Sequence, residues 1–440
     1  MNYFRGFFIF VLLFSSPCSV FGSAITEHTL KNGLKVIIIE EHKSPVATFQ
    51  VWYRAGSMNE PLGKSGLSHL LEHMMFKGTE QHGPSELSMI IQRNGGTDNA
   101  YTTKDYTAYF ELMPSDKISL PIGLEADRMK NLALDDREVM AERSVVMEER
   151  RLRYEDDPQN ALYEEVVAAA FKAHPYQRPV IGWMSDLKSI EKNDLQQYYK
   201  QHYAPNNAFV IVVGDVSTEE ILKTIDETYG DLEPAPESKS HQFDEPEQRG
   251  ERRIYLRREA ELPYLLMAYH VPNFPHEDSF ALDVLTLILS GGKSTRLYQS
   301  LIYEKQIALS ASSSYHGFYR DPFLFFVSAT AAPGKDIKDV ETLLNEEIDR
   351  IKNELPSEYE IQKAKNQIES SFIFDQDSIF MQAMKYGTFE MLGSWKNIDI
   401  YLEGIRTVTP QDVTDVAEKY LGAGNRTVGI LIPITKERGQ

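Results

Sequence analysis

The chain has 440 residues, of which 42% are apolar and 25% charged, and its formal net charge is −19. This length exceeds what one ordinary hydrophobic core supports, so we expect a folded protein of at least two domains. The negative charge argues against a general nucleic-acid-binding protein, because such proteins carry basic surfaces.

Residues 1–24 have the features of a secretory signal peptide. Arg5 precedes an eight-residue apolar run, residues 7–14, which is too short to span a bilayer. Small residues follow, and cleavage after Gly22 or after Ala24 is equally compatible with them. The only cysteine, Cys18, lies inside this segment, so the mature chain would contain no disulfide. We therefore predict a secreted, periplasmic protein without a transmembrane anchor.

The first predicted elements after this segment are β-strands. Residues 26–49 are predicted to contain two strands, because Asn32-Gly33 is a hairpin-turn signal and residues 36–39 form a buried β run. The second of these strands starts after Ser44-Pro45 and is expected to run over residues 46–53. A loop over residues 56–66 then leads into the stretch on which the functional prediction depends.

That stretch, residues 65–78, carries the pattern His-x-x-Glu-His and is predicted to be an amphipathic helix. Ser65 is a suitable N-cap and Gly78 a suitable C-terminal stop. His69, Glu72 and His73 fall on one arc of this helix. The apolar residues at helical spacing on the opposite side are Leu67, Leu70, Leu71, Met74 and Met75.

This spacing suits metal-assisted hydrolysis. Two histidines four residues apart can bind one Zn²⁺ ion, and a catalytic zinc keeps a position open for water. A carboxylate that is not a ligand, here Glu72, can take a proton from that water. The alternative is a chance match on a solvated helix face, expected in roughly one of fifty chains of this length. A third ligand would decide between the two.

The His-x-x-Glu-His pattern is that of an inverted zincin, and the sequence resembles the M16 metallopeptidases, the family of pitrilysin, insulin-degrading enzyme and mitochondrial processing peptidase. The resemblance implies a third zinc ligand about seventy-five residues after the second histidine, which is Glu149. Residues 135–154 lack Gly and Pro, so they are predicted to be helical, with Glu142 on the same face as Glu149 and Glu148 turned away. Glu142 would then orient a histidine. By spacing alone, a solvated charged helix remains open.

The resemblance also implies a substrate-binding strand. Residues 97–110 are rich in β-branched and aromatic side chains and follow the helix-breaking stretch Asn94-Gly95-Gly96. Asn99, Ala100 and Tyr101 match the family's positions on an edge strand that extended peptides join by β-addition, which gives affinity with loose side-chain specificity. An ordinary sheet strand with a turn at Lys104-Asp105 is the alternative.

The second half of the chain repeats the first. Residues 190–195 and 408–413, and then Asn207 and Asn425, correspond at a constant offset of 218. We therefore predict an α+β protein of two homologous domains, each a mainly antiparallel sheet with packed helices. The zinc-bearing domain would span residues 25–232, a polar, proline-rich linker 233–251, and a domain without a metal motif 252–440. Residues 282–289 occupy the place of the metal helix and contain no histidine.

The family commonly contributes an arginine and a tyrosine from the second domain to substrate binding. Those positions here hold Ile302 and Leu309, and Arg296 and Tyr298 are not that pair. The resemblance therefore favours a heterodimer with a relative that carries the Arg/Tyr pair, and otherwise a homodimer.

The functional prediction is a zinc-dependent endopeptidase that holds extended peptides or small unfolded polypeptides in a chamber, with His69, His73 and Glu149 on the metal and Glu72 as general base. The alternative is a non-catalytic scaffold or substrate-binding subunit of a peptidase complex.

Overall fold

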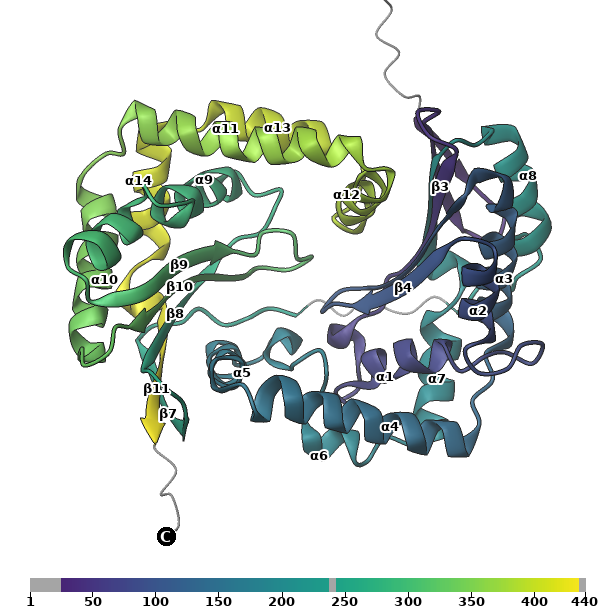
Figure 1. Cartoon of the computed structure of the whole chain (residues 1–440), viewed down its shortest axis with the longest axis horizontal. Helices are drawn as coiled ribbons and strands as arrows, with labels where there is room; N and C mark the ends of the chain where they lie inside the picture. The colour runs from purple at the N-terminus through teal and green to yellow at the C-terminus, as the bar shows by residue number, and fades with distance from the viewer. Residues whose placement is uncertain (1–24, 237–242, 435–440) are drawn as a thin grey trace, which may run out of the picture.

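The computed structural model describes residues 25–236 and 243–434, so the predicted signal peptide lies outside the described residues. Two β-sheets, each covered by helices, face each other across the molecule (Figure 1). This confirms the predicted α+β class with two domains. We call residues 25–232 the first half and residues 252–434 the second half.

The first half contains a six-stranded sheet in the order β1-β2-β6-β3-β5-β4. Only the β2–β6 pair is parallel. The hairpin at Asn32-Gly33 separates β1 from β2, so residues 25–53 form three strands, one more than predicted. The strands are β1 (Ile25–Thr29), β2 (Lys35–Glu40), β3 (Val46–Tyr53), β4 (Thr97–Thr102), β5 (Thr107–Pro114) and β6 (Ala208–Gly214).

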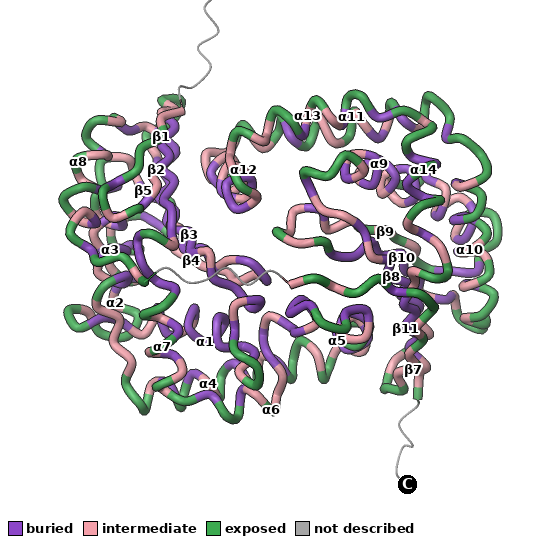
Figure 2. The backbone as a smooth tube through the Cα atoms, turned by 180° about the vertical axis from the view of Figure 1, so that it is seen from behind, coloured by how far each residue is buried: buried purple, intermediate pink, exposed green. Residues whose placement is uncertain are grey.

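The first half contains eight helices, and its buried core runs along the strands (Figure 2). The helices are α1 (Leu67–Met75), α2 (Glu86–Arg93), α3 (Ser119–Asn131), α4 (Asp136–Arg150), α5 (Pro158–Ala170), α6 (Met184–Leu187), α7 (Lys192–His202) and α8 (Thr218–Tyr229). A single π turn over Arg151–Glu155 continues α4, which accounts for the long uninterrupted helix expected there.

The second half contains a five-stranded sheet in the order β7-β11-β8-β10-β9, in which only β7 and β11 are parallel. Its strands are β7 (Arg252–Glu259), β8 (Tyr264–Val271), β9 (Ala308–Tyr315), β10 (Phe323–Ala331) and β11 (Arg426–Ile434). Its helices are α9 (Asp278–Ser290), α10 (Ile337–Asn353), α11 (Glu358–Phe374), α12 (Ile379–Met391), α13 (Asn397–Thr407) and α14 (Pro410–Tyr420).

The two sheets have the same topology once β1 is set aside. The order β2-β6-β3-β5-β4 corresponds to β7-β11-β8-β10-β9, with the parallel pair at the same place. The two asparagines matched by sequence make matching bonds: Asn207 Nδ2 donates to the His202 carbonyl at 2.8 Å, and Asn425 Nδ2 to the Tyr420 carbonyl at 2.9 Å. The internal repeat is therefore a structural duplication.

The halves pack by exchanging helices. Helix α5 of the first half lies on β8 and β11, and helix α12 of the second half lies on β3 and β6. Each helix buries an apolar face against the other half's sheet, as Leu162 and Val166 do beside Phe326, and Ala383 beside Trp52 and Phe209. Burial of these apolar faces holds the two sheets in a fixed position relative to each other.

The described part of the predicted linker is fastened to the first half. The Glu245 carboxylate accepts the backbone N–H groups of Lys172, Ala173 and His174 at 2.6–2.9 Å. Within residues 25–236 and 243–434, no helix is both long enough and apolar enough to cross a bilayer.

Candidate metal centre

Helix α1 begins at Leu67 because the chain before it is held in one conformation. Gly66, the N-cap, has φ +89°, and a Cβ there would lie 2.5 Å from the Ile181 carbonyl oxygen. The buried Glu60 carboxylate accepts the N–H groups of Gly66 and Ser68 at 3.0 and 2.7 Å, so an anion satisfies the helix N-terminus. Burial raises the pKa of Glu60 to about 7.

The predicted limits of this helix were wrong at both ends. Ser65 does not cap it, because its hydroxyl donates to Asp186 at 2.6 Å instead. The helix ends at Met75, and Gly78, with φ +101°, turns the chain three residues later. The five apolar residues of the stripe are all buried, as the amphipathic pattern predicted.

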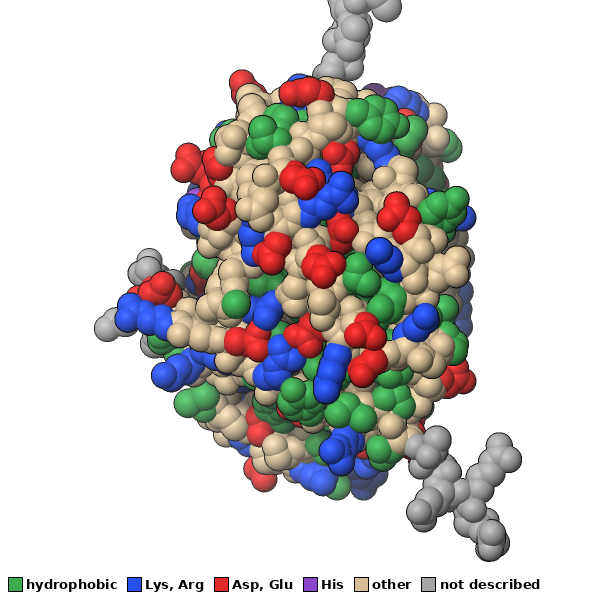
Figure 3. Space-filling view, turned by 90° about the vertical axis from the view of Figure 1, so that its left-hand side faces the viewer, with side chains coloured by type: hydrophobic (Ala, Val, Ile, Leu, Met, Phe, Trp, Pro, Cys, Tyr) green, Lys and Arg blue, Asp and Glu red, His purple; other side chains and the backbone are tan. Residues whose placement is uncertain are grey.

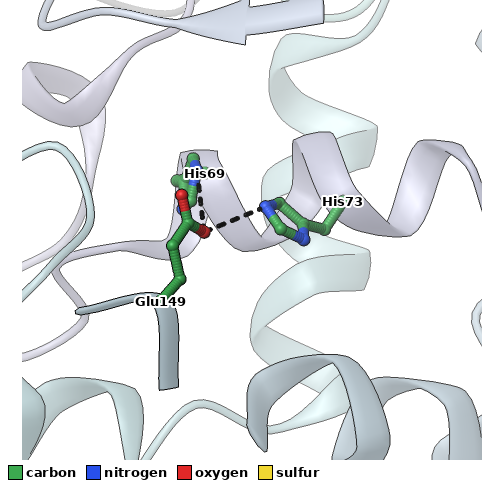
Figure 4. Close-up of side chains that lie close together, drawn as sticks. All are labelled: His69, His73 and Glu149. Atoms are coloured by element: carbon green, nitrogen blue, oxygen red, sulfur yellow. Dashed lines mark ion pairs between the residues drawn. The ribbon is translucent and has the colours of Figure 1, made fainter. Parts of the chain in front are cut away.

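The structure brings together His69 and His73 of α1 and Glu149 of α4 (Figure 4). Glu149 Oε2 lies 3.8 Å from His69 Nε2 and 3.5 Å from His73 Nε2. One potential ligand atom from each residue lies within 4.8 Å of the other two. The three side chains therefore converge on one point between the two helices.

This geometry fits a tetrahedral zinc ion. Ligand atoms about 2.1 Å from such an ion lie about 3.4 Å from each other. Glu149 Oε2 is buried and lacks a hydrogen bond of ordinary length, since His73 Nε2 lies 3.5 Å away, although a buried carboxylate oxygen normally has such a bond. Two imidazole nitrogens and a carboxylate oxygen are a donor set that zinc accepts. The residues present thus fit the metal.

Glu142 and Lys77 fix the orientation of His73. Glu142 Oε1 lies 2.9 Å from His73 Nδ1, and Lys77 Nζ lies 2.6 Å from the other oxygen of Glu142. The bond to Nδ1 leaves Nε2 directed at Glu149. Without metal, burial lowers the pKa of His73, but its bonds to Glu142 and Glu149 outweigh burial and raise that pKa to about 9.

The two neighbouring glutamates of α4 have separate surroundings. Glu149 pairs with Arg153 at 2.8 Å besides facing the histidines, and the hydrogen bond from His73 helps to lower the pKa of its carboxyl. Glu148 lies on the exposed side of the helix and pairs with Arg151 at 2.5 Å. Its position makes Glu148 a natural control for Glu149.

Glu72 lies beside the three converging side chains and is held from β4. Thr102 Oγ1 donates to Glu72 Oε2 at 2.5 Å. Burial raises the pKa of Glu72, whereas the Thr102 hydroxyl counteracts that rise. Thr102 is not among the site residues predicted from the sequence. The available signal was β-strand alternation, which puts Thr102 on the same face as Ala100.

The three residues expected to bind substrate lie on β4, which forms one edge of the first sheet. Thr102 is directed towards α1, whereas the hydroxyl of Tyr101, one residue earlier, approaches Met384 Sδ of α12 at 3.9 Å. Asn99 Oδ1 accepts the N–H of Ala100 at 2.9 Å. The outer edge of β4 therefore lies between α1, which carries His69 and His73, and α12 of the second half.

The second half contributes no arginine–tyrosine pair at the family's positions. Arg296 Nε donates to Glu360 Oε1 of α11 at 2.8 Å. Ile302 packs against the second core, and Leu309 is exposed on the edge strand β9.

Two family models match the chain. The model described as "Insulinase (Peptidase family M16)" matches residues 35–183, which include all three converging residues and Glu72. The model described as "Peptidase M16 inactive domain" matches residues 189–368. The match thus covers both halves, with the metal motif confined to the first.

Curated relatives and solved structures align over nearly the whole chain. Zinc protease PqqE of Helicobacter pylori is 30% identical over 409 residues, 92% of either chain, and an uncharacterized zinc protease of Bacillus subtilis, YmxG, is 27% identical over 90% of this chain and 95% of its own. A protease structure from Helicobacter pylori has a TM-score of 0.90 at 30% identity and covers 93% of this chain and 100% of that one. A peptidase M16 inactive-domain structure from Pseudomonas fluorescens, at 17% identity, shares the fold with a TM-score of 0.81 over 94% and 98% of the two chains.

Proposed function

Because the chain belongs to the peptidase M16 family, we propose that it is a zinc-dependent endopeptidase acting on extended peptides. The observation that carries the proposal is the approach of Glu149 Oε2 to the Nε2 atoms of His69 and His73, at 3.8 and 3.5 Å, with Glu72 alongside. Those three residues would hold the zinc.

Each residue of the centre has one part in the proposed reaction. Zinc, when bound, supplies polarisation of water and of the scissile carbonyl. Glu72 accepts a proton from the attacking water and returns it to the leaving amine, because a buried carboxylate with a raised pKa can both accept and donate. Thr102 keeps that carboxylate in place, and Glu142 keeps His73 facing the metal.

The substrate would join the first sheet at β4. An extended peptide on this edge forms backbone hydrogen bonds with residues 97–102, including Asn99, Ala100 and Tyr101. Backbone pairing is indifferent to side chains, which suits an enzyme that cleaves many sequences. The space between the two halves then acts as the chamber that holds the peptide.

A second candidate function is a substrate-binding subunit without activity. The observation that favours it is the match of residues 189–368 to an inactive-domain model. In that case the first half would retain the fold and the metal residues would serve structure alone. We rank it second because His69, Glu72, His73 and Glu149 are all present and close together.

The substitution Glu72→Gln tests the proposal. Loss of the general base is expected to lower peptide cleavage by about 10²–10⁴-fold while zinc stays bound. Cleavage of a peptide library with and without a chelator gives the first readout, and zinc quantification of the purified variant gives the second. A zinc-loaded wild-type protein that cleaves no peptide, or a variant as active as wild type, would contradict the proposal.

The proposal also covers where the protein acts and which protein it assembles with. We propose export directed by residues 1–24 and assembly with a relative that supplies the Arg/Tyr pair, since Ile302 and Leu309 stand at those positions. Native mass spectrometry of the mature chain, alone and with such a relative, distinguishes a heterodimer from a homodimer. A tight, fully active homodimer would argue against the heterodimer.

A further inference from the structure

A pocket in the second half contains a carboxylate that no cation balances. The pocket has a volume of about 580 Å³ and lies between α9, α11, α12 and α13. That size is within the range of about 300–1,000 Å³ found for small-ligand sites. Its apolar lining residues are Leu287, Phe318, Ile368, Phe372, Met381, Met384, Phe389 and Tyr401.

Asp283 of α9 is the unbalanced group. Its only hydrogen-bond donor among the described residues is the Tyr401 hydroxyl, which reaches one carboxylate oxygen at 3.1 Å. Burial raises the pKa of Asp283 to about 7, and the Tyr401 bond is the only influence that lowers it. A carboxylate in an apolar site without a cationic partner is unfavourable, so a cationic ligand there would gain a desolvated ion pair.

Among the described residues, Lys385 is the one cation that lines the pocket, and it is already engaged. Lys385 Nζ donates to the Phe372 carbonyl at 2.7 Å and pairs with Asp375 at 3.2 Å. Its ammonium also lies 3.6 Å from the centroid of the Phe372 ring. These contacts engage the lysine elsewhere, so no cation of the pocket lining pairs with Asp283.

On the face of the second half shown in Figure 3, acidic and basic side chains are interspersed and form no single-sign patch. Selection for a positive ligand therefore depends on the pocket interior rather than on a long-range field from that face.

The pocket reaches the edge strand β4 through one side chain. Met384 lines the pocket, and its sulfur lies 3.9 Å from the Tyr101 hydroxyl. Next to it, the Phe380 ring of α12 contacts Phe110 of β5, with centroids 4.9 Å apart. Side chains of a peptide paired with β4 alternate between the sheet's two faces, so every second one points towards α12.

We propose that this pocket binds an ammonium or guanidinium group on an unbranched apolar stem, supplied by a lysine or arginine of the peptide lying along β4. The apolar walls hold the stem, and Asp283 accepts a charge-assisted hydrogen bond from the cation. The volume also accommodates part of the neighbouring residue. The peptide part of this proposal rests on the proposed function, whereas binding of the cation does not.

Calorimetric titration with n-hexylamine tests the cation site directly. Hexylamine should bind the full chain more tightly than n-hexanol or hexanoate, which have the same stem without the positive charge. Asp283→Asn should weaken hexylamine at least about tenfold, because a hydrogen bond between charged groups is lost. Asp399→Asn is the matched control. Asp399 is exposed on the helix that carries Tyr401, so its substitution should leave the affinity for hexylamine unchanged.

Equal binding of hexylamine to Asp283→Asn and wild type, or binding no tighter than that of hexanol, would overturn the proposal. Asparagine keeps an oxygen for Tyr401, so the fold should persist. Should thermal melting show that it does not, Met381→Trp fills the pocket mouth from a side chain that is 40% exposed. That variant should abolish hexylamine binding, and retained binding would again overturn the site.

Paired peptides identify the source of the cation. Peptides that carry lysine or norleucine at successive positions are compared for KM, and Asp283→Asn should raise the lysine KM to the norleucine value. Hexylamine binding with equal KM values for both peptides would overturn the peptide part and assign the pocket to free amines. Absence of any cleavage together with Asp283-dependent hexylamine binding would instead contradict the proposed function and leave the cation site standing.

Discussion

The two halves of the molecule share one fold and differ in what a single helix carries. Helix α1 places His69, Glu72 and His73 beside the first sheet, whereas α9, which follows the matching strand β8, contains no histidine. The strand order and the parallel pair are the same in both. The proposed metal chemistry therefore depends on four side chains of the first half rather than on the fold, which occurs in the second half without them.

The halves are nevertheless not independent. Each lends a helix to the other's sheet, α5 to the second and α12 to the first. Trp52 and Phe209 of the first sheet are fully buried in a cluster that they share with Ala383 and Met391 of α12. The half without metal residues thus completes the core of the half that has them, which gives a physical reason for the retention of both copies.

The largest expected effect concerns the residue that joins α4 to the metal helix. Glu149→Gln replaces the proposed ligand carboxylate by an amide, so the purified variant should contain little zinc and lose peptide cleavage. Glu148→Gln, one residue away on the exposed side, should bind zinc and cleave as wild type does. Metal analysis of both variants after dialysis provides the comparison. Full zinc content in Glu149→Gln would place the metal elsewhere.

Several features of this centre could be predicted from the sequence because they are periodic or local. The His-x-x-Glu-His spacing, the shared face of Glu142 and Glu149, and the offset of 218 are all regularities along the chain. The structure places each of them as expected, although binding of metal and substrate is still a prediction.

The features that the sequence did not reveal depend on contacts between distant segments. The N-terminus of α1 is satisfied by the Glu60 side chain rather than by the adjacent Ser65, because Asp186 engages that serine. Thr102 reaches Glu72 only once β4 lies beside α1. The exchange of α5 and α12 requires both sheets to be formed, so no local pattern reports it.

The corresponding helices α7 and α14 should differ in how much they make the free energy of unfolding depend on acid pH. His202 ends α7, and at the offset of 218 its counterpart on α14 is Tyr420. Burial lowers the pKa of His202 to about 4, against about 6.5 in an unfolded chain. The unfolded state therefore binds more protons between these values, and stability is lost as the pH falls from about 6.5 to 4.

The substitution His202→Gln should remove up to about 3 kcal/mol of this pH dependence, because each pKa unit corresponds to about 1.4 kcal/mol. Chemical denaturation at pH 7 and pH 4.5 gives the unfolding free energies. The control is His28→Gln, since His28 is exposed on β1 of the same half. An unchanged slope in His202→Gln would show that other groups cause the acid sensitivity of the first half.

A smaller loss is expected where Glu142 supports the metal helix. Glu142→Gln keeps the size of the side chain but weakens its bonds to His73 and Lys77. Partners of this kind change metal affinity by about 10–100-fold when they are altered. Competition with a zinc-binding dye measures the affinity, and Glu148→Gln, an exposed glutamate on the same helix that pairs with Arg151, is the control. Equal affinities would mean that His73 keeps its orientation unaided.

The smallest expected effect tests the exchanged helices. A Cβ at Gly387 of α12 would lie 2.3 Å from the Trp52 ring, which is fully buried and bonded to Gln50 at 3.0 Å, so the ring cannot move aside. Gly123 of α3 has no atom within 4 Å of the same position. Alanine favours both helices by about 0.5–1 kcal/mol, but at Gly387 overpacking costs about 1–3 kcal/mol. Gly123→Ala should therefore raise the free energy of unfolding and Gly387→Ala lower it, as thermal or denaturant unfolding would measure. Equal stabilisation by both substitutions would mean that α12 can withdraw from the first sheet, and that the metal-bearing half does not depend on its partner for its core.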